Sequence, residues 1–205
     1  MKRRKLFLLL TAFILTNIVG VHAQSIIYDA TSPNKVLAFT AEQQGDEVYA
    51  IGNARTVTQL QIGLSMQGFS GTSDFVLRLY ANDGTAGAPG SLLWQSGLFN
   101  NVPLSGSVQL VSFDVPNVTV PDVFTWTIQI SDSNPVAVGL VGANPPSIGS
   151  SPAKTWFGGP GDWGQISNPQ DIMVRVVAVP EPGISVLLCL CLGVLMLKHQ
   201  FRQAS

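Results

Sequence analysis

Hydrophobic and polar residues alternate along most of the central part of the chain. Residues 123–131 have the clearest pattern, with an apolar side chain at every second position: Phe124, Trp126, Ile128 and Ile130. The positions between them are polar: Thr125, Thr127 and Gln129. A period of two residues is typical of a β-strand with one buried face, whereas the apolar positions of an amphipathic helix repeat about every 3.6 residues. We therefore expect the apolar set to face a core and the polar set to face outward.

The same alternation predicts further strands on both sides of this segment. Residues 55–66 would point four apolar side chains inward: Leu60, Ile62, Leu64 and Met66. Residues 75–80 would point Arg78 outward. Shorter candidates follow the same rule: 25–30, 35–40, 47–51, 91–96, 107–114, 136–141 and 171–179. Because turn-forming residues separate these runs and no window has a helical period, we predict an all-β domain, an antiparallel two-sheet sandwich of jelly-roll type.

The N-terminal segment has the three parts of a secretory signal peptide. Residues 2–5 are basic, residues 6–21 are largely apolar, and Val21-His22-Ala23 has the small residues that a cleavage site requires. We therefore assign residues 1–23 to a signal peptide that uses the Sec translocon. Cleavage between Ala23 and Gln24 would leave an exported domain of residues 24–179.

A second hydrophobic run, residues 183–197, follows Pro180-Glu181-Pro182 and precedes a basic tail, residues 198–205. The two prolines fix φ and lack amide donors, so the motif should be extended and unpaired. As a helix the run spans roughly 22 Å, less than a ~30 Å hydrocarbon core, so it would cross only with local thinning of the bilayer. The positive charges follow the run, which predicts a cytoplasmic tail and an external domain.

This order of motif, apolar run and basic tail resembles the PEP-CTERM sorting signal of Gram-negative bacteria. The resemblance implies that residues 180–205 are a tag handled by an exosortase, a membrane-embedded cysteine transpeptidase-like enzyme. It also implies a precursor anchored transiently in the inner membrane, and a product at the cell surface or in the extracellular matrix, associated with exopolysaccharide. The tail departs from the family's tight arginine cluster, because three residues separate Lys198 from Arg202. An ordinary C-terminal anchor with a proline spacer is the alternative.

Removal of both ends leaves an acidic domain. The whole chain has a net charge of −1, but residues 24–179 carry five basic residues against eleven acidic ones, a net charge of −6. Nucleic acid binding needs clustered Lys and Arg, so we expect no nucleic acid partner.

Both cysteines, Cys189 and Cys191, and both histidines, His22 and His199, lie in the targeting segments. The domain therefore lacks the residues of a Ser-His-Asp triad, a Cys-His pair or a His-ligated zinc site, and we predict no catalytic residue, metal or cofactor.

Two tryptophans bracket a Gly/Pro-rich segment near the end of the domain. A loop of this kind can present flat apolar rings and a carboxylate to a sugar, which makes Trp156, Asp162 and Trp163 candidates for carbohydrate contact. The alternative is that both rings cover one end of the core beneath the loop.

Acidic residues suggest two further hypotheses. Residues 82–85 and 131–134 offer oxygen donors suited to Ca²⁺, but neither has the spacing of a recognised calcium loop, and such turns form for backbone reasons alone. Glu42 and Glu47 are the only glutamates of the domain and could form the carboxylate pair of a glycosidase. Because they flank Asp46 in a polar stretch, a solvated turn is the simpler interpretation.

Much of residues 30–179 also resembles the choice-of-anchor R domain. The segments that carry the resemblance are 75–84, 88–93, 124–126 and Asp162-Trp163. It implies a surface β-domain with no established activity, which recurs ahead of different anchoring signals. The sequence therefore favours a noncatalytic exported surface protein, with a carbohydrate-binding module and a carboxylate glycosidase as the alternatives.

Overall fold

The computed structural model describes residues 23–38, 43–131, 138–152, 154–166 and 171–180, so the hydrophobic runs at both ends lie outside the described residues. Residues Gln24–Val179 form one compact unit. Its strands are, in chain order, β1 (Ser25–Asp29), β2 (Pro33–Ala38), β3 (Gln43–Tyr49), β4 (Ala54–Ser65), β5 (Gly71–Ala81), β6 (Leu92–Gln95), β7 (Phe99–Leu104), β8 (Gln109–Thr119), β9 (Val123–Ile130), β10 (Gly139–Ala143), β11 (Thr155–Gly159), β12 (Asp162–Gln165) and β13 (Val174–Pro180). A short 3₁₀ turn, η1 (Thr85–Gly87), follows β5. Within these ranges no helix is long and apolar enough to span a bilayer.

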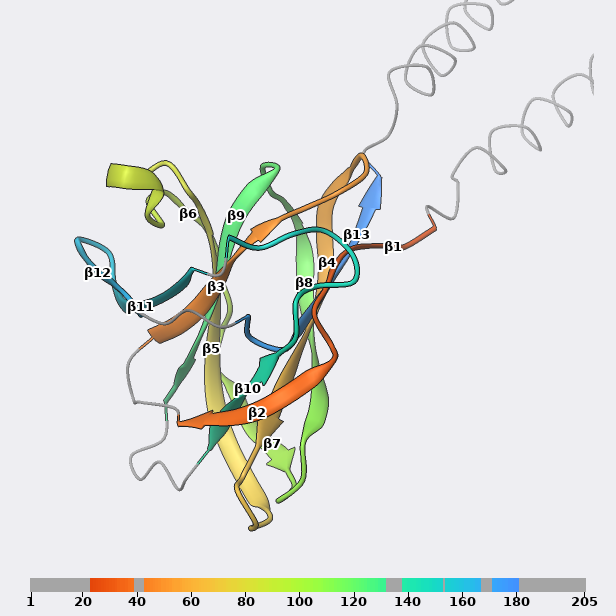
Figure 1. Cartoon of the computed structure of the whole chain (residues 1–205), viewed down its shortest axis with the longest axis vertical. Helices are drawn as coiled ribbons and strands as arrows, with labels where there is room; N and C mark the ends of the chain where they lie inside the picture. Colours follow the sequence, from red (N-terminus) through yellow and green to blue (C-terminus); the bar gives the residue numbers. More distant parts are fainter. Residues whose placement is uncertain (1–22, 39–42, 132–137, 153, 167–170, 181–205) are drawn as a thin grey trace, which may run out of the picture. The chain divides into compact units, whose positions relative to one another are not determined.

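The strands form two antiparallel sheets, so the all-β prediction is confirmed (Figure 1). The six-stranded sheet has the order β1-β13-β4-β10-β2, and β8 pairs with β4. The seven-stranded sheet has the order β12-β11-β3-β9-β5-β6, and β7 also pairs with β5. Neighbours in both sheets come from distant parts of the sequence, so each sheet forms only after most of the domain is present.

The inward faces of the two sheets share one hydrophobic core. The predicted inward residues of both long strands are buried, which confirms the alternation: Leu60, Ile62, Leu64, Met66, Phe124, Trp126, Ile128 and Ile130. Phe75 of β5 meets Phe113 of β8 across the two sheets, edge to face, with ring centroids 6.1 Å apart. Burial of these large side chains, at about 1.5–3 kcal/mol each, is the main stabilising term of the fold.

Three strands and one boundary differ from the sequence prediction. We expected no strand at β7, β11 or β12. We also placed Asp46 and Glu47 in a polar turn, but β3 begins at Gln43, and both side chains are buried in a strand that pairs with β11 and with β9. The polar composition of this strand misled the sequence rule, because two flanking strands satisfy its backbone regardless of its side chains.

Asp46 joins the two sheets. It has 0% exposed surface and lies on the inward face of β3, opposite Trp126 in the strand register. Its carboxyl oxygens accept hydrogen bonds from the Thr155 hydroxyl at 2.8 Å and from the backbone amide of Ile172 at 2.6 Å. Thr155 belongs to the same sheet, whereas Ile172 leads into β13 of the other sheet. One side chain therefore fixes the spacing of the two sheets at this point.

Burial dominates the titration of this region. Desolvation raises the pKa of Asp46 well above its ordinary value; its two hydrogen bonds oppose that rise, and the charges of Asp171 and Glu47 add to it. Desolvation also raises the pKa of Asp171 and of Tyr28, and for Tyr28 the nearby carboxylates act in the same direction. The folded domain therefore holds these groups in their protonated forms over a wider pH range than the unfolded chain does.

The raised pKa of Asp46 predicts a specific pH dependence of stability. Because the folded state binds the proton more tightly, the contribution of Asp46 is complete below the unfolded pKa of about 3.9, and is lost as pH rises from there towards the folded pKa. The substitution Asp46→Asn keeps an acceptor for Ile172 and removes the ionisation. We expect it to match the wild type near pH 4 and to be the more stable protein at pH 8, by about 1.4 kcal/mol for each unit of pKa shift.

Chemical denaturation between pH 4 and pH 8 measures this difference. Asp46→Ala should lose about 2 kcal/mol or more at every pH, because it removes the acceptor of a buried amide and of a buried hydroxyl. Asp83→Asn is the matched control: the pKa of this exposed carboxylate is lowered, first by its bond from the Ser91 hydroxyl, so its contribution is lost as pH falls. An Asp46→Asn protein that is less stable than the wild type at pH 8 would show that the buried carboxylate is ionised.

Candidate functional site

Strands β11 and β12 form a hairpin where the sequence predicted a loop. Gly159 pairs with Asp162, so Pro160 and Gly161 are the two turn residues. Gly161 has φ 89°, a left-handed conformation that suits glycine, and proline presets the φ of the position before it. The Gly/Pro sequence therefore encodes a tight turn between two short strands, and β11 gains its second partner from β3.

The hairpin places the predicted carbohydrate-contact residues in three different environments. Trp156 lies opposite Gly45 of β3, and Trp163 lies opposite Gly158, so both rings are on the outer face of the seven-stranded sheet, away from the core. Trp156 is only 6% exposed. Trp163 is partly exposed and Asp162 is exposed beside the turn. Only Trp163 and Asp162 therefore offer surface to a ligand.

The outer face of the seven-stranded sheet is strongly curled. Trp163 of β12 meets Tyr80 of β5 edge to face, with ring centroids 5.3 Å apart. Four strand spacings separate β12 from β5 in the sheet order, which would be about 19 Å in a flat sheet. Figure 1 shows β11 and β12 standing out from β3 on the side away from β4, β8 and β13. The hairpin therefore folds back over the outer face and brings β12 above β5.

This curl explains why polar residues on the outer face are buried. Thr125 and Thr127 of β9 point outward, as predicted, but both have 0% exposed surface. Gln43 of β3 lies beside them and donates from Nε2 to the Thr127 hydroxyl at 2.9 Å and to the Tyr80 hydroxyl at 3.1 Å. The outer face thus carries a second, smaller interior made of hydrogen-bonded polar groups and aromatic rings.

Arg78 of β5 completes this polar interior and lies at its edge. Its Nη1 donates to Gln43 Oε1 at 2.9 Å and to Gln129 Oε1 at 3.0 Å, and its Nε donates to Gln95 Oε1 at 2.7 Å. The hydrogen bonds link β6, β5, β9 and β3 in one row. Gln95 is exposed and Arg78 is partly exposed, so solvent reaches this end of the row.

Two indole N–H groups at this face have no acceptor among the described residues. Both Trp156 Nε1 and Trp163 Nε1 are buried and make no hydrogen bond there. Buried tryptophans usually place this donor on an acceptor. An oxygen-rich ligand or water would satisfy such donors, which marks the hairpin side of the face as a place for polar contact.

Glu47 lies on the same outer face but is unsuited to hydrolysis as it stands. Its side chain is almost fully buried, and Lys154 Nζ lies 3.7 Å from its Oε2. The pKa of Tyr49 is raised, first by its hydrogen bond to Glu47 and then by desolvation and the Glu47 charge. The carboxylate of Glu47 therefore faces Lys154 and Tyr49 and not open solvent. Glu42, the other half of the predicted carboxylate pair, lies outside the described residues.

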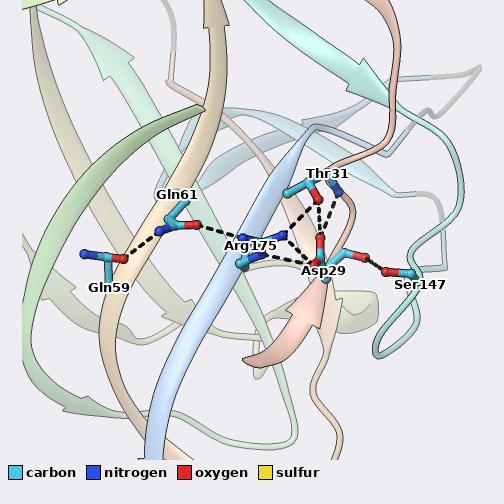
Figure 2. A network of polar contacts seen from close by, with 6 residues as sticks. All are labelled: Asp29, Thr31, Gln59, Gln61, Ser147 and Arg175. Atoms are coloured by element: carbon cyan, nitrogen blue, oxygen red, sulfur yellow. Dashed lines mark hydrogen bonds and ion pairs between the residues drawn. The ribbon is translucent and has the colours of Figure 1, made fainter. Parts of the chain in front are cut away.

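The outer face of the six-stranded sheet carries a different polar network (Figure 2). Arg175 of β13 contacts Asp29 Oδ2 through Nη2 at 2.9 Å and through Nε at 3.0 Å. The same guanidinium donates to Thr31 Oγ1 and to Gln61 Oε1, and Gln61 in turn donates to Gln59. Here the arginine charge is neutralised by a carboxylate of a neighbouring strand.

The segment considered as a calcium candidate, residues 82–85, uses its carboxylate internally. Asp83 accepts hydrogen bonds from the Ser91 amide and the Ser91 hydroxyl, both at 2.6 Å, so it closes the connection between β5 and β6. Across the described part of the chain no three His, Cys, Asp or Glu side chains are grouped to hold a metal ion. Most of the second candidate, residues 131–134, lies outside the described residues.

The junctions with the predicted targeting segments are neighbours in the six-stranded sheet. Ser25 of β1 pairs with Ala178 of β13, and Gln24 Nε2 donates to Thr58 Oγ1 beside them. Ala23 and Gln24 are exposed, and Pro180 is the last residue of β13. Glu181 and Pro182 of the sorting motif lie outside the described residues.

Comparisons with protein-family models, with curated proteins and with solved structures find no match for this chain. Its function is therefore inferred from the residues and their geometry.

The contact between Trp163 and Tyr80 predicts how the hairpin is held. Trp163→Ala should destabilise the domain by about 1–2 kcal/mol and release the hairpin from the outer face, because it removes the ring that packs on β5. Hydrogen exchange should accelerate in residues 155–165 and at Thr127. Trp163→Phe, which keeps a ring, and Gln165→Ala, which alters an exposed side chain of the same strand, are the controls. Unchanged exchange in Trp163→Ala would mean that pairing with β3 alone positions the hairpin.

Proposed function

We propose that this chain is an exported protein of the cell surface or extracellular matrix, sorted by an exosortase through a C-terminal PEP-CTERM tag. The domain acts without catalysis, in association with exopolysaccharide. The signal peptide, residues 1–23, directs it to the Sec translocon, and residues 183–197 anchor the precursor in the inner membrane with its C-terminus in the cytoplasm. Residues 180–182 are the motif that the sorting enzyme reads.

The observation that best supports this proposal is the pairing of β1 with β13. A precursor with hydrophobic segments at both ends holds the two ends of its folded domain at the same membrane surface. Ser25 and Ala178 are paired residues, so both ends of the compact unit leave from one place without a linker. A domain whose ends lay at opposite poles would need a long spacer on one side.

We further propose that the two sheets form a sandwich of jelly-roll type. Their sheet orders support this, because strands from the two ends of the chain are neighbours in both sheets: β1 beside β13, and β3 between β11 and β9. Long connections that bring distant strands together are the signature of Greek-key and jelly-roll folds.

Carbohydrate binding is a second candidate function of the same domain. The contact of Trp163 with Tyr80 favours it, because this contact folds the hairpin over a face that combines aromatic rings with amide and guanidinium donors. Sugars are bound by such combinations of flat apolar surface and planar polar groups. Surface attachment and glycan contact are compatible, since an exported protein held in a polysaccharide layer needs both.

The sorting motif can be tested by replacing Pro180, Glu181 and Pro182 with alanine together. We expect normal removal of the signal peptide and a folded domain, with the precursor retained in the inner membrane by residues 183–197. Loss of the prolines would let the apolar helix extend into the motif. Cell fractionation and mass spectrometry of the mature C-terminus measure the result. Glu181→Gln alone should slow processing if the enzyme reads the charge.

Alanine in place of Pro145 and Pro146, in a loop of the domain, is the matched control and should be processed normally. If the triple-alanine protein reached the surface in normal amounts with its tail removed, residues 180–182 would be only a spacer.

A further inference from the structure

Arg78 differs from the other arginines of the domain in its partners. The ion pairs of the described residues join Arg55 to Asp122 at 2.6 Å, Lys154 to Glu47 at 3.7 Å and Arg175 to Asp29 at 2.9 Å. Arg78 forms none of them, although the domain has more than twice as many acidic as basic residues. Among the described residues its charge therefore has no carboxylate partner, and the polar groups that contact it are neutral amides.

Three glutamines hold this charge in a fixed position. Gln43, Gln129 and Gln95 accept from Nη1 and Nε of Arg78 at distances between 2.7 and 3.0 Å. Nη2 makes no hydrogen bond with any residue that the structure describes. An amide carbonyl orients a guanidinium as well as a carboxylate does, but it leaves the positive charge in place.

Arg175 is the internal comparison, because it lies on the outer face of the other sheet in a similar row of polar side chains (Figure 2). There Asp29 takes two donors of the guanidinium, and Gln61 and Thr31 take one each. That arrangement stabilises the sheet and leaves no net charge. The structural arginine of this domain is thus paired with a carboxylate. Arg78 differs, because all of its hydrogen-bond acceptors among the described residues are glutamine amides.

The surroundings of Arg78 add aromatic surface and unsatisfied donors. Tyr80 is two residues along the same face of β5, and Trp163 packs on it with a partly exposed ring. The buried N–H groups of Trp163 and Trp156 lack acceptors among the described residues. A fixed cation and a partly exposed ring on one face match a pyranose that carries a carboxylate.

We propose that Arg78 is a binding residue for the carboxylate of an acidic saccharide, with Trp163 beside the sugar ring. This proposal rests on the proposed association with exopolysaccharide and names the class of sugar. A guanidinium edge binds a carboxylate through charge-assisted hydrogen bonds that a neutral sugar cannot form. The net charge of −6 opposes non-specific attraction of a polyanion, so binding depends on this one site.

The test uses the full chain purified in detergent, with oligogalacturonate as the probe and the same oligosaccharide with its carboxyl groups reduced to alcohols as the neutral counterpart. Isothermal titration calorimetry should show binding of the acidic probe, and at least about tenfold weaker binding of the reduced one. Arg78→Met should weaken binding of the acidic probe about tenfold or more. Lys35→Met, which removes one exposed positive charge on β2, should leave it unchanged.

Gln129→Glu keeps the proposal testable if Arg78→Met fails to fold. The new carboxylate would lie beside Nη1 of Arg78 and neutralise it, so the protein should be at least as stable as the wild type and should bind the acidic probe as weakly as Arg78→Met. Equal affinity for both probes, or unchanged affinity in either variant, overturns the proposal. Mass spectrometry of the C-terminus on the same protein in cells reports sorting separately, so normal processing without acidic-sugar binding overturns this inference alone.

Discussion

The hydrogen-bonded carboxyl group of Asp46 is the constraint on which the arrangement of the two sheets depends. Apolar packing brings the sheets together but does not by itself define their relative position, because many apolar contacts have similar energies. The bonds from Thr155 and Ile172 to Asp46 have a defined geometry, and a buried donor left unpaired costs about 1–3 kcal/mol. The position of β3 against β13 is therefore specified by polar groups inside an apolar core.

The outer faces of the two sheets both carry an arginine in a row of polar side chains, but the two arginines have different partners. On the six-stranded sheet a carboxylate neutralises Arg175, and the row of polar groups ends as a solvated surface. On the seven-stranded sheet Thr127, Gln43 and Tyr80 are buried, and Trp163 of the β11–β12 hairpin packs on Tyr80, while Arg78 lies at the boundary with solvent. Sheet curvature, and not composition, makes this difference.

The sequence predicted the elements whose information is local. Strict alternation in residues 55–66 and 123–131 identified both strands and their buried faces, since apolar side chains at every second position lie on one face only in a β-strand. It missed the first half of β3, residues 43–46, which is mostly polar and which is extended because β9 and β11 pair with it. Local and non-local information differ in the same way at the candidate site. Trp163 and Asp162 could be identified from the sequence because they lie beside a turn. Gln43 and Gln129 could not, because only the register of distant strands brings their amides to Arg78.

Strand β13 lies between β1 and β4, although it is the last strand of the chain. During synthesis from the N-terminus, β1 and β4 are made long before β13 and have no partner on that side. The sheet closes only when residues 174–179 are available to pair with both. Completion of this sheet therefore waits for the last strand of the domain, and a chain that stalls earlier displays open strand edges that proteases and chaperones can recognise.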